Sequence, residues 1–260
     1  MRVTFDSNVW EKVVSNEYIE SKDLSLIRQS IEQRVIEPYI CEVALSLESI
    51  MKKERLNHAS NRQLKIEVVS SEWRDNKYKG VIGIGPDNDT HPGIPLILKH
   101  KLELAKDLGF KVLPMTNIGT ARAKDINESL KIGFSSTDDF WVYAEKLAEC
   151  GDFISSLECG FSGYENLLKK YKIKTSPHLM LNKLATKTEK KKFAQAVAEW
   201  SDGDSLAAHY AYDNDIFCTN DFGKGAGKAS VFYPENLNVL SKKYNMRVVS
   251  VGELASIIST

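Results

Sequence analysis

Residues 203–224 have the sequence GDSLAAHYAYDNDIFCTNDFGK. The first half is rich in small and apolar residues at helical spacing, so it predicts a helix that begins near Asp204. Residues 216–219 form a short apolar run that predicts a buried strand, and Asp221 follows it in a glycine-rich loop. A helix that leads directly into a buried strand is typical of an α/β fold with a mainly parallel sheet.

The two ends of the chain show the same alternation of helices and short apolar strands. The pattern predicts strands at 2–6, 39–41 and 247–250, and helices up to about residue 34, over 42–55, over 235–244 and from residue 252 onwards. We therefore expect residues 1–61 and 200–260 to form one α/β core.

The middle of the chain, residues 62–199, follows this alternation less regularly. It predicts a hairpin that turns at residues 75–76, a strand at 111–115, and helices over 95–110, 138–150, 161–172 and 188–200. We expect a mixed α/β, mostly helical insertion that forms a cap or a substrate-binding region.

Composition excludes several classes of protein. The 260 residues include 35 Lys and Arg against 35 Asp and Glu, and no apolar run approaches the roughly 18 residues that span a bilayer. The N-terminal sequence lacks the apolar stretch of a signal peptide. The four cysteines include no C-x-x-C pair, so neither a disulfide framework nor a zinc site is expected. These features predict a cytoplasmic protein with no membrane partner.

Acidic residues occur where an α/β fold gathers its functional groups. Asp6 ends the first predicted strand and Asp221 follows a later one, and ligands bind beyond the carboxyl ends of parallel strands. Glu48 and Asp204 lie on predicted helices. Four carboxylates in one site would repel one another unless cations neutralised them, and oxygen ligands favour Mg²⁺ or Mn²⁺.

Each acidic residue also has a purely structural interpretation. A helix N-cap, an Asx-turn and a solvated helix face all use Asp or Glu. The alternatives are N-caps at Asp6 or Ser7 and at Asp202 or Asp204, an Asx-turn at Asp221, and a surface position for Glu48. His209 lies off the helix face of Asp204, and we expect it to pack rather than to bind metal.

Taken in order, these segments resemble the motifs of the PIN-domain nucleases. VTFDSNVW at 3–10 is similar to the first motif, an apolar strand that ends in Asp and is followed by Ser and Asn. YICEVALSLES at 39–49 is similar to the second, a helix that carries a Glu. The segment 203–224 is similar to the third and fourth motifs together. The resemblance implies a PIN-like three-layer α/β/α sandwich.

The resemblance also implies roles for individual residues. The metal ligands and catalytic groups are Asp6, Glu48 (with Glu42 as the alternative), Asp204 and Asp221. Ser7, Asn8, Thr219 and Asn220 would position these ligands, with Asp202 as a further ligand or water holder. The family cleaves RNA most often, so the expected activity is that of a Mg²⁺- or Mn²⁺-dependent endoribonuclease that uses a metal-activated water.

This resemblance implies partners as well, and it leaves other functions open. A toxin or defence effector would be restrained by an antitoxin or another regulatory protein, and the long insertion could mediate homo-oligomerisation. One alternative is a non-catalytic module of the same fold that binds nucleic acid or assembles with other proteins. An α/β phosphatase with Asp6 as nucleophile is less favoured, because Asn8 and Trp10 occupy the positions where its motifs need Asp or Thr.

The neutral total charge conceals two segments of opposite sign. Residues 160–199 contain nine Lys and three Glu, whereas residues 200–223 contain five Asp and neither Lys nor Arg. The first segment could contact the phosphates of RNA or another single-stranded nucleic acid, although such charge runs are commonly solvated helix faces. Lys224 and Lys228, in the glycine-rich loop, are the predicted nucleic-acid-binding residues closest in sequence to the acidic site.

Overall fold

The central element is a five-stranded, fully parallel sheet. The computed structural model describes residues 1–48, 64–74, 77–86, 93–115, 126–170, 186–223 and 225–259. The strand order is β5-β2-β1-β6-β7. The strands are β1 (Arg2–Phe5), β2 (Glu37–Cys41), β5 (Lys111–Leu113), β6 (Ile216–Cys218) and β7 (Val248–Val249). The prediction of an α/β fold with a mainly parallel sheet is confirmed.

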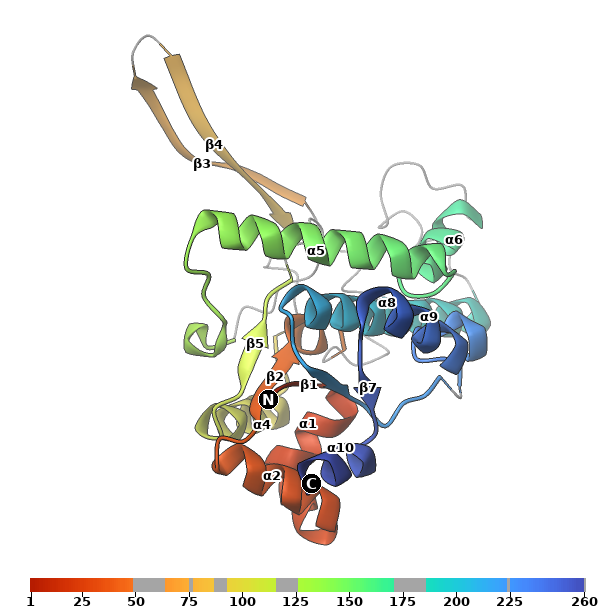
Figure 1. Cartoon of the computed structure of the whole chain (residues 1–260). Helices are drawn as coiled ribbons and strands as arrows, with labels where there is room; N and C mark the ends of the chain where they lie inside the picture. The colour runs from red at the N-terminus through yellow and green to blue at the C-terminus, as the bar shows by residue number, and fades with distance from the viewer. Residues whose placement is uncertain are drawn as a thin grey trace.

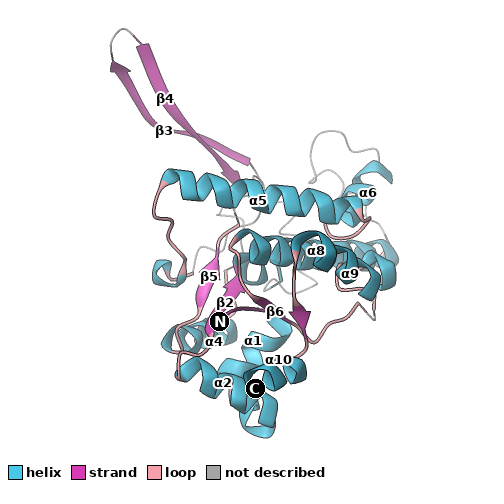
Figure 2. Cartoon of the chain, in the orientation of Figure 1, coloured by secondary structure: helices cyan, strands magenta, loops and turns pink. Residues whose placement is uncertain are grey.

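The strand order reverses between β1 and β6. The chain builds outward from β1 through β2 to β5, and it then returns to the other side of β1 with β6 and β7. Because parallel crossovers are right-handed, such a reversal puts the two sets of connecting helices on opposite faces of the sheet. Figure 2 shows the strands between two groups of helices, an arrangement compatible with a three-layer α/β/α sandwich.

The helices divide between the two faces as the topology requires (Figure 1). One face carries α1 (Ser7–Val14), α2 (Lys22–Glu32), α4 (Leu96–Asp107) and α10 (Val251–Ile258). The other carries α5 (Thr137–Ser156), α6 (Ser162–Lys170), α8 (Lys187–Ala211) and α9 (Pro234–Tyr244). Shorter helical turns are η1 (Asn16–Glu20), the π-helix η2 (Ala44–Glu48), η4 (Glu128–Leu130) and η5 (Gly227–Ala229). Among the described residues, no helix is long and apolar enough to cross a membrane.

Helix α8 differs from the sequence-based prediction. The sequence predicted two helices with a break near Gly203, but α8 runs unbroken through this residue. A Cβ at Gly203 would lie 3.0 Å from the Cα of Gly160, the residue shortly before α6. Gly203 therefore allows two backbones to approach closely inside the structure and does not end the helix.

The segment 62–199 is more closely joined to the core than expected. It supplies β5, which pairs with β2, and the first half of α8. The predicted hairpin is present as β3 (Leu64–Arg74) and β4 (Lys77–Pro86), and it projects from the body as a separate two-stranded ribbon (Figure 1). The boundary expected at residue 199 thus falls inside α8, and the boundary expected at residue 62 lies outside the described residues.

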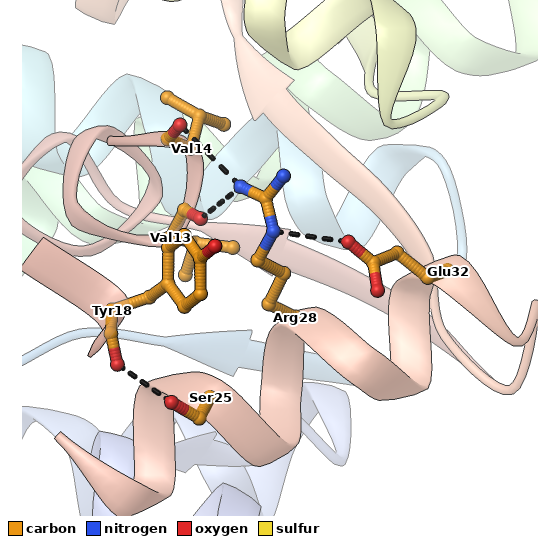
Figure 3. A network of polar contacts seen from close by, with 6 residues as sticks. All are labelled: Val13, Val14, Tyr18, Ser25, Arg28 and Glu32. Atoms are coloured by element: carbon orange, nitrogen blue, oxygen red, sulfur yellow. Dashed lines mark hydrogen bonds and ion pairs between the residues drawn. The ribbon is translucent and has the colours of Figure 1, made fainter. Parts of the chain in front are cut away.

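Arg28 on α2 holds the end of α1 in place (Figure 3). Its Nη1 donates to the carbonyl oxygens of Val13 and Val14 at 3.1 and 3.4 Å, and its Nε donates to Glu32 at 3.0 Å. The guanidinium lies 4.4 Å from the ring centroid of Tyr18. These contacts satisfy carbonyl groups that the end of a helix leaves without intrahelical donors.

Replacing Arg28 should destabilise the packing of α1 on α2 and leave the contacts within the sheet unchanged. We expect Arg28→Met to lower the free energy of unfolding by about 1–2 kcal/mol, because it removes charge-assisted hydrogen bonds and a cation–π contact. Urea denaturation measures this change. The control is Gln29→Met, an exposed position on the same helix. Equal stability of the two variants would contradict the role of Arg28.

Candidate active site

The candidate site lies where the order of the strands reverses. Asp6 directly follows β1, and residues 219–221 directly follow β6, the parallel neighbour of β1. The carboxyl ends of adjacent strands at such a reversal leave a crevice in which open α/β sheets bind their ligands. The topology therefore brings together two sequence motifs that are more than 200 residues apart.

Asp6 is buried and held by four donors. Its Oδ1 accepts from the backbone N–H of Ser7 at 2.7 Å and more weakly from the Ser7 hydroxyl at 3.4 Å. Its Oδ2 accepts from Asn8 Nδ2 at 2.5 Å and from Thr219 Oγ1 at 2.6 Å. Asp6 is the N-cap of α1 through Oδ1, as the structural interpretation expected, while Oδ2 is held by groups from two different elements.

The loop after β6 is tied to the same network. Asn8 Oδ1 accepts from the backbone N–H of Asn220 at 3.0 Å, and Thr219 Oγ1 accepts from that of Asp221 at 2.9 Å. Asp221 Oδ1 in turn accepts from the N–H of Gly223 at 2.8 Å, which is the expected Asx-turn. The four residues predicted to position the ligands thus lie around Asp6 and Asp221.

The ionisation of Asp6 is unfavourable in this setting. Burial raises the pKa of Asp6, and the negative charge of Asp221 raises it further. Hydrogen bonds from Thr219 and Ser7 oppose this rise. A buried carboxyl group whose ionisation is opposed by burial and by a neighbouring carboxylate is a setting in which a cation gains binding energy.

Asp204 lies at the same level along the sheet as Asp6, because α8 packs against β1 and runs in the opposite direction. His209 Nδ1 lies 2.9 Å from Thr4 Oγ1, and Arg2 donates to the carbonyl oxygen of Tyr212, so helix and strand run in opposite directions. Asp6 lies two residues beyond Thr4, or about 6.6 Å along a strand. Asp204 lies five residues before His209, or about 7.5 Å along a helix.

His209 has the packing role expected from sequence. It is 2% exposed, and burial lowers its pKa to about 3, so its ring is neutral near pH 7. The Asn214 side chain also donates to Thr4 Oγ1, at 2.8 Å. His209 therefore aligns α8 with β1 from inside the protein.

The Asp204 carboxyl group is buried without a full set of partners. It is 7% exposed, and among the described residues its Oδ2 has no hydrogen-bond partner. Burial raises its pKa to about 7, against a hydrogen bond from the Trp200 indole. A buried carboxylate oxygen without a donor costs folding free energy, so the position requires an explanation other than stability.

Glu199 is a site residue that the sequence did not reveal. It lies on α8, where burial raises its pKa to about 7; the charge of Asp221, close enough to act on it, adds to the rise, and a hydrogen bond from Ser230 opposes it. Its Oε2 also has no partner among the described residues. The available signal was its place in the apolar run at 193–201, where a solvated Glu is out of place.

Glu42 and Glu48 remain alternatives for the second motif. Glu42 follows β2, is 3% exposed, and accepts from the backbone N–H of Met115 at 2.8 Å. The charges of Asp204 and Glu42 both add to the burial that raises the pKa of Cys41, which places both acids near this thiol. Glu48 ends η2, which packs against α8, but its side chain lies outside the described residues.

The remaining predicted residues differ in their burial and in whether the structure describes them. Asp202 is half-buried on α8 and does not cap a helix, because α8 is continuous there. Lys228 is exposed in η5, and Lys224 lies outside the described residues. The four cysteines are buried and free, as the absence of a disulfide framework predicted.

Two further observations concern metal-binding groups and cavities among the described residues. Across the described ranges, no group of three or more His, Cys, Asp or Glu side chains is arranged to hold a metal ion. A hollow of about 720 Å³ lies at the opposite edge of the sheet, next to the Glu37–Lys111 ion pair, and contains none of the candidate residues.

Comparisons with known proteins add no assignment. Neither a protein-family model, nor a curated protein, nor a solved structure matches the chain. A function for the chain therefore has to be inferred from the geometry of its acidic residues.

Gly223 should be essential to the shape of the loop. Its φ is +69°, and a Cβ there would lie 2.9 Å from the backbone N of Tyr233. We expect Gly223→Ala to lower the free energy of unfolding by roughly 1–3 kcal/mol, measured by thermal denaturation. Gly225→Ala is the control, because a Cβ at Gly225 meets no atom within 4 Å. Similar losses in both variants would contradict this view of the turn.

Asp204 should make the metal-free protein less stable as the pH rises. Its pKa is about 7 when folded, against an ordinary value of 3.8. From about pH 4 to pH 7 the folded state binds the extra proton, so the free energy of unfolding falls as pH rises through this window. Asp204→Asn should remove the contribution of Asp204 to this fall and gain roughly 1–3 kcal/mol at pH 8 in EDTA, while the contribution of Glu199, whose pKa is also raised to about 7, remains.

Urea denaturation at pH 4, 6 and 8 measures the effect. Asp152→Asn is the matched control, since Asp152 is exposed on α5. If wild type and Asp204→Asn differ by the same amount at all three pH values, the buried ionisation of Asp204 is refuted.

Proposed function

We propose that this chain is a metal-dependent nuclease of the PIN-domain type and that it hydrolyses phosphodiester bonds in RNA. One observation carries the proposal. Asp204 Oδ2 is buried and lacks a partner among the described residues, and the contact of His209 with Thr4 puts Asp204 at the level along the sheet where Asp6 follows β1. A carboxylate kept in this state at the reversal of strand order is suited to a cation that brings its own positive charge.

The residues present suit a hard divalent cation. Asp6, Asp204 and Asp221 offer only oxygen ligands, which Mg²⁺ and Mn²⁺ prefer, and His209 is occupied inside the core. Glu48 is the proposed fourth ligand, and Glu199 is an additional acidic neighbour of Asp221. Such a cation, when bound, lowers the pKa of water and offsets negative charge on the scissile phosphate.

The chain itself would orient the acids. Hydrogen bonds from Thr219 and Asn8 occupy both lone pairs of Asp6 Oδ2 and fix the orientation of the carboxyl group. The oxygen left for a cation is Oδ1, because its second donor is the Ser7 hydroxyl at 3.4 Å, a weak contact. Asn8 also ties the loop after β6 to α1 through Asn220. A nucleic-acid strand that approaches this edge would meet side chains already held in place, which reduces the cost of ordering them.

A second function is favoured by a different observation. The described residues contain no group of three acids arranged for a metal ion, and this favours a non-catalytic module that binds nucleic acid or assembles with other proteins. In such a module Asp6 and Asp221 would act only as the helix cap and the turn residue that they form. Cleavage assays separate the two functions.

The remaining expectations stay predictions. They are a role as a toxin or defence effector, restraint by an antitoxin or another regulatory protein, homo-oligomerisation, and action in the cytoplasm. The toxin or effector role and its restraint by a partner depend on the nuclease proposal, whereas the cytoplasmic location was predicted from composition.

Loss of either central acid should abolish activity and leave the fold intact. We expect Asp6→Asn and Asp204→Asn each to reduce cleavage of single-stranded RNA in Mg²⁺ or Mn²⁺ more than about 100-fold, since a metal ligand is lost. Gel electrophoresis follows cleavage, and circular dichroism checks folding. Asp152→Asn should cleave as wild type does. Cleavage that persists in EDTA, or in both site variants, would contradict the proposal.

A further inference from the structure

The contacts between α6 and α8 set the direction in which these helices run. Phe161 lies next to Trp200, with ring centroids 4.9 Å apart, and Tyr164 lies next to Phe193, at 5.9 Å. As residue numbers rise along α6 they fall along α8, so the two helices are antiparallel. The last residues of α6 therefore point toward the N-terminal end of α8, against which α6 packs.

This packing gathers lysines at one end of the molecule. We call the group the lysine end; all its members are exposed, and they are Lys169, Lys170, Lys187, Lys190, Lys191 and Lys192. The four on α8 lie in its first turns, where the positive end of the helix dipole disfavours cations. The Thr186–Glu189 capping box offsets part of this cost. Helix stability therefore gives no reason for four lysines at this position.

The lysine end and the acidic site lie on the same helix. Lys192 precedes Glu199 by seven residues, which is two turns on one face of α8 and about 10 Å along its axis. Lys190 precedes Asp204 by fourteen residues, or about 21 Å. Since α8 is unbroken from residue 187 to residue 211, these spacings are fixed within one rigid element.

We propose that the lysine end binds the phosphates of a single-stranded nucleic acid whose scissile phosphate lies at the acidic site. This inference rests on the proposed function, and it assigns the side of the molecule from which the nucleic-acid strand reaches the acidic site. A stacked strand repeats every 3.4 Å, so about 21 Å corresponds to roughly six nucleotides. A single strand fits better than a duplex, because the residues Asp6 and Asp204 are each only 7% exposed.

The test measures binding without cleavage. The variant carries Lys190→Gln, Lys191→Gln and Lys192→Gln, and the probe is a fluorescent single-stranded RNA of twenty nucleotides, titrated in EDTA and followed by anisotropy. We expect roughly tenfold weaker binding near 0.1 M salt, and a slope of log affinity against log salt that is shallower by about 2. A DNA strand of equal length shows whether the site requires RNA.

A matched triple variant on the opposite layer serves as control. It carries Lys12→Gln, Lys22→Gln and Lys106→Gln, at exposed positions of α1, α2 and α4, and it should bind as wild type does. Four results would overturn the inference. They are an equal loss of affinity in both triple variants, no loss in the lysine-end variant, no binding by the wild type, and tighter binding of duplex RNA than of single-stranded RNA.

Cleavage assays distinguish this failure from failure of the proposed function. With Mg²⁺ or Mn²⁺, the lysine-end variant should cleave the twenty-nucleotide strand more slowly but a dinucleotide at the wild-type rate. Lysine-dependent binding without any cleavage would refute the nuclease alone. Cleavage of the long strand that is unaffected by the lysine substitutions would refute the lysine end alone.

Discussion

The alignment of α8 with β1 is the constraint on which the site depends. Thr4 Oγ1 lies between His209 and the side chain of Asn214, and the backbone N–H of Asp215 donates to the carbonyl oxygen of Arg2 at 2.9 Å. These contacts fix the height of the helix relative to the strand. A shift of α8 by one turn, about 5.4 Å, would carry Asp204 away from the level of Asp6.

The site combines carboxyl groups that protein folding alone would disfavour. Asp204 and Glu199 are buried to the extent that the pKa of each rises to about 7, and each keeps an oxygen without a partner among the described residues. Residues selected for stability would rarely leave such groups in place, whereas functional sites often do. Asp6 differs from Asp204 and Glu199, because its carboxyl group accepts from four donors and so has a defined orientation.

The sequence was informative where local chemistry decides the structure. The strand that ends in Asp6, the cap at the start of α1 and the turn at Asp221 depend on neighbouring residues, and all three follow from the pattern. The parallel sheet follows from the alternation of helices and strands. Asn8 and Thr219 were expected beside Asp6 only because their segments resemble the PIN-domain motifs, and the side chains of both donate hydrogen bonds to Asp6.

Features that depend on distant contacts could not be predicted. Gly203 suggested a helix break, but its closeness to Gly160 is a contact between elements that the sequence does not reveal. β5 belongs to the central sheet because it pairs with β2. A run of three strand residues does not by itself show which strand it pairs with. Glu199 stands out in the apolar run at 193–201, but only the fold brings it near Asp221.

The central claim is that these carboxylates gather to hold a divalent cation, and Mn²⁺-dependent stabilisation tests it most directly. A ligand that binds only the folded state raises the melting temperature as its concentration rises. We predict that Mn²⁺ raises the melting temperature of the wild-type protein and leaves that of Asp204→Asn unchanged. An equal rise in both proteins, or no rise in the wild type, would contradict a metal centre at the carboxyl edge of β1 and β6.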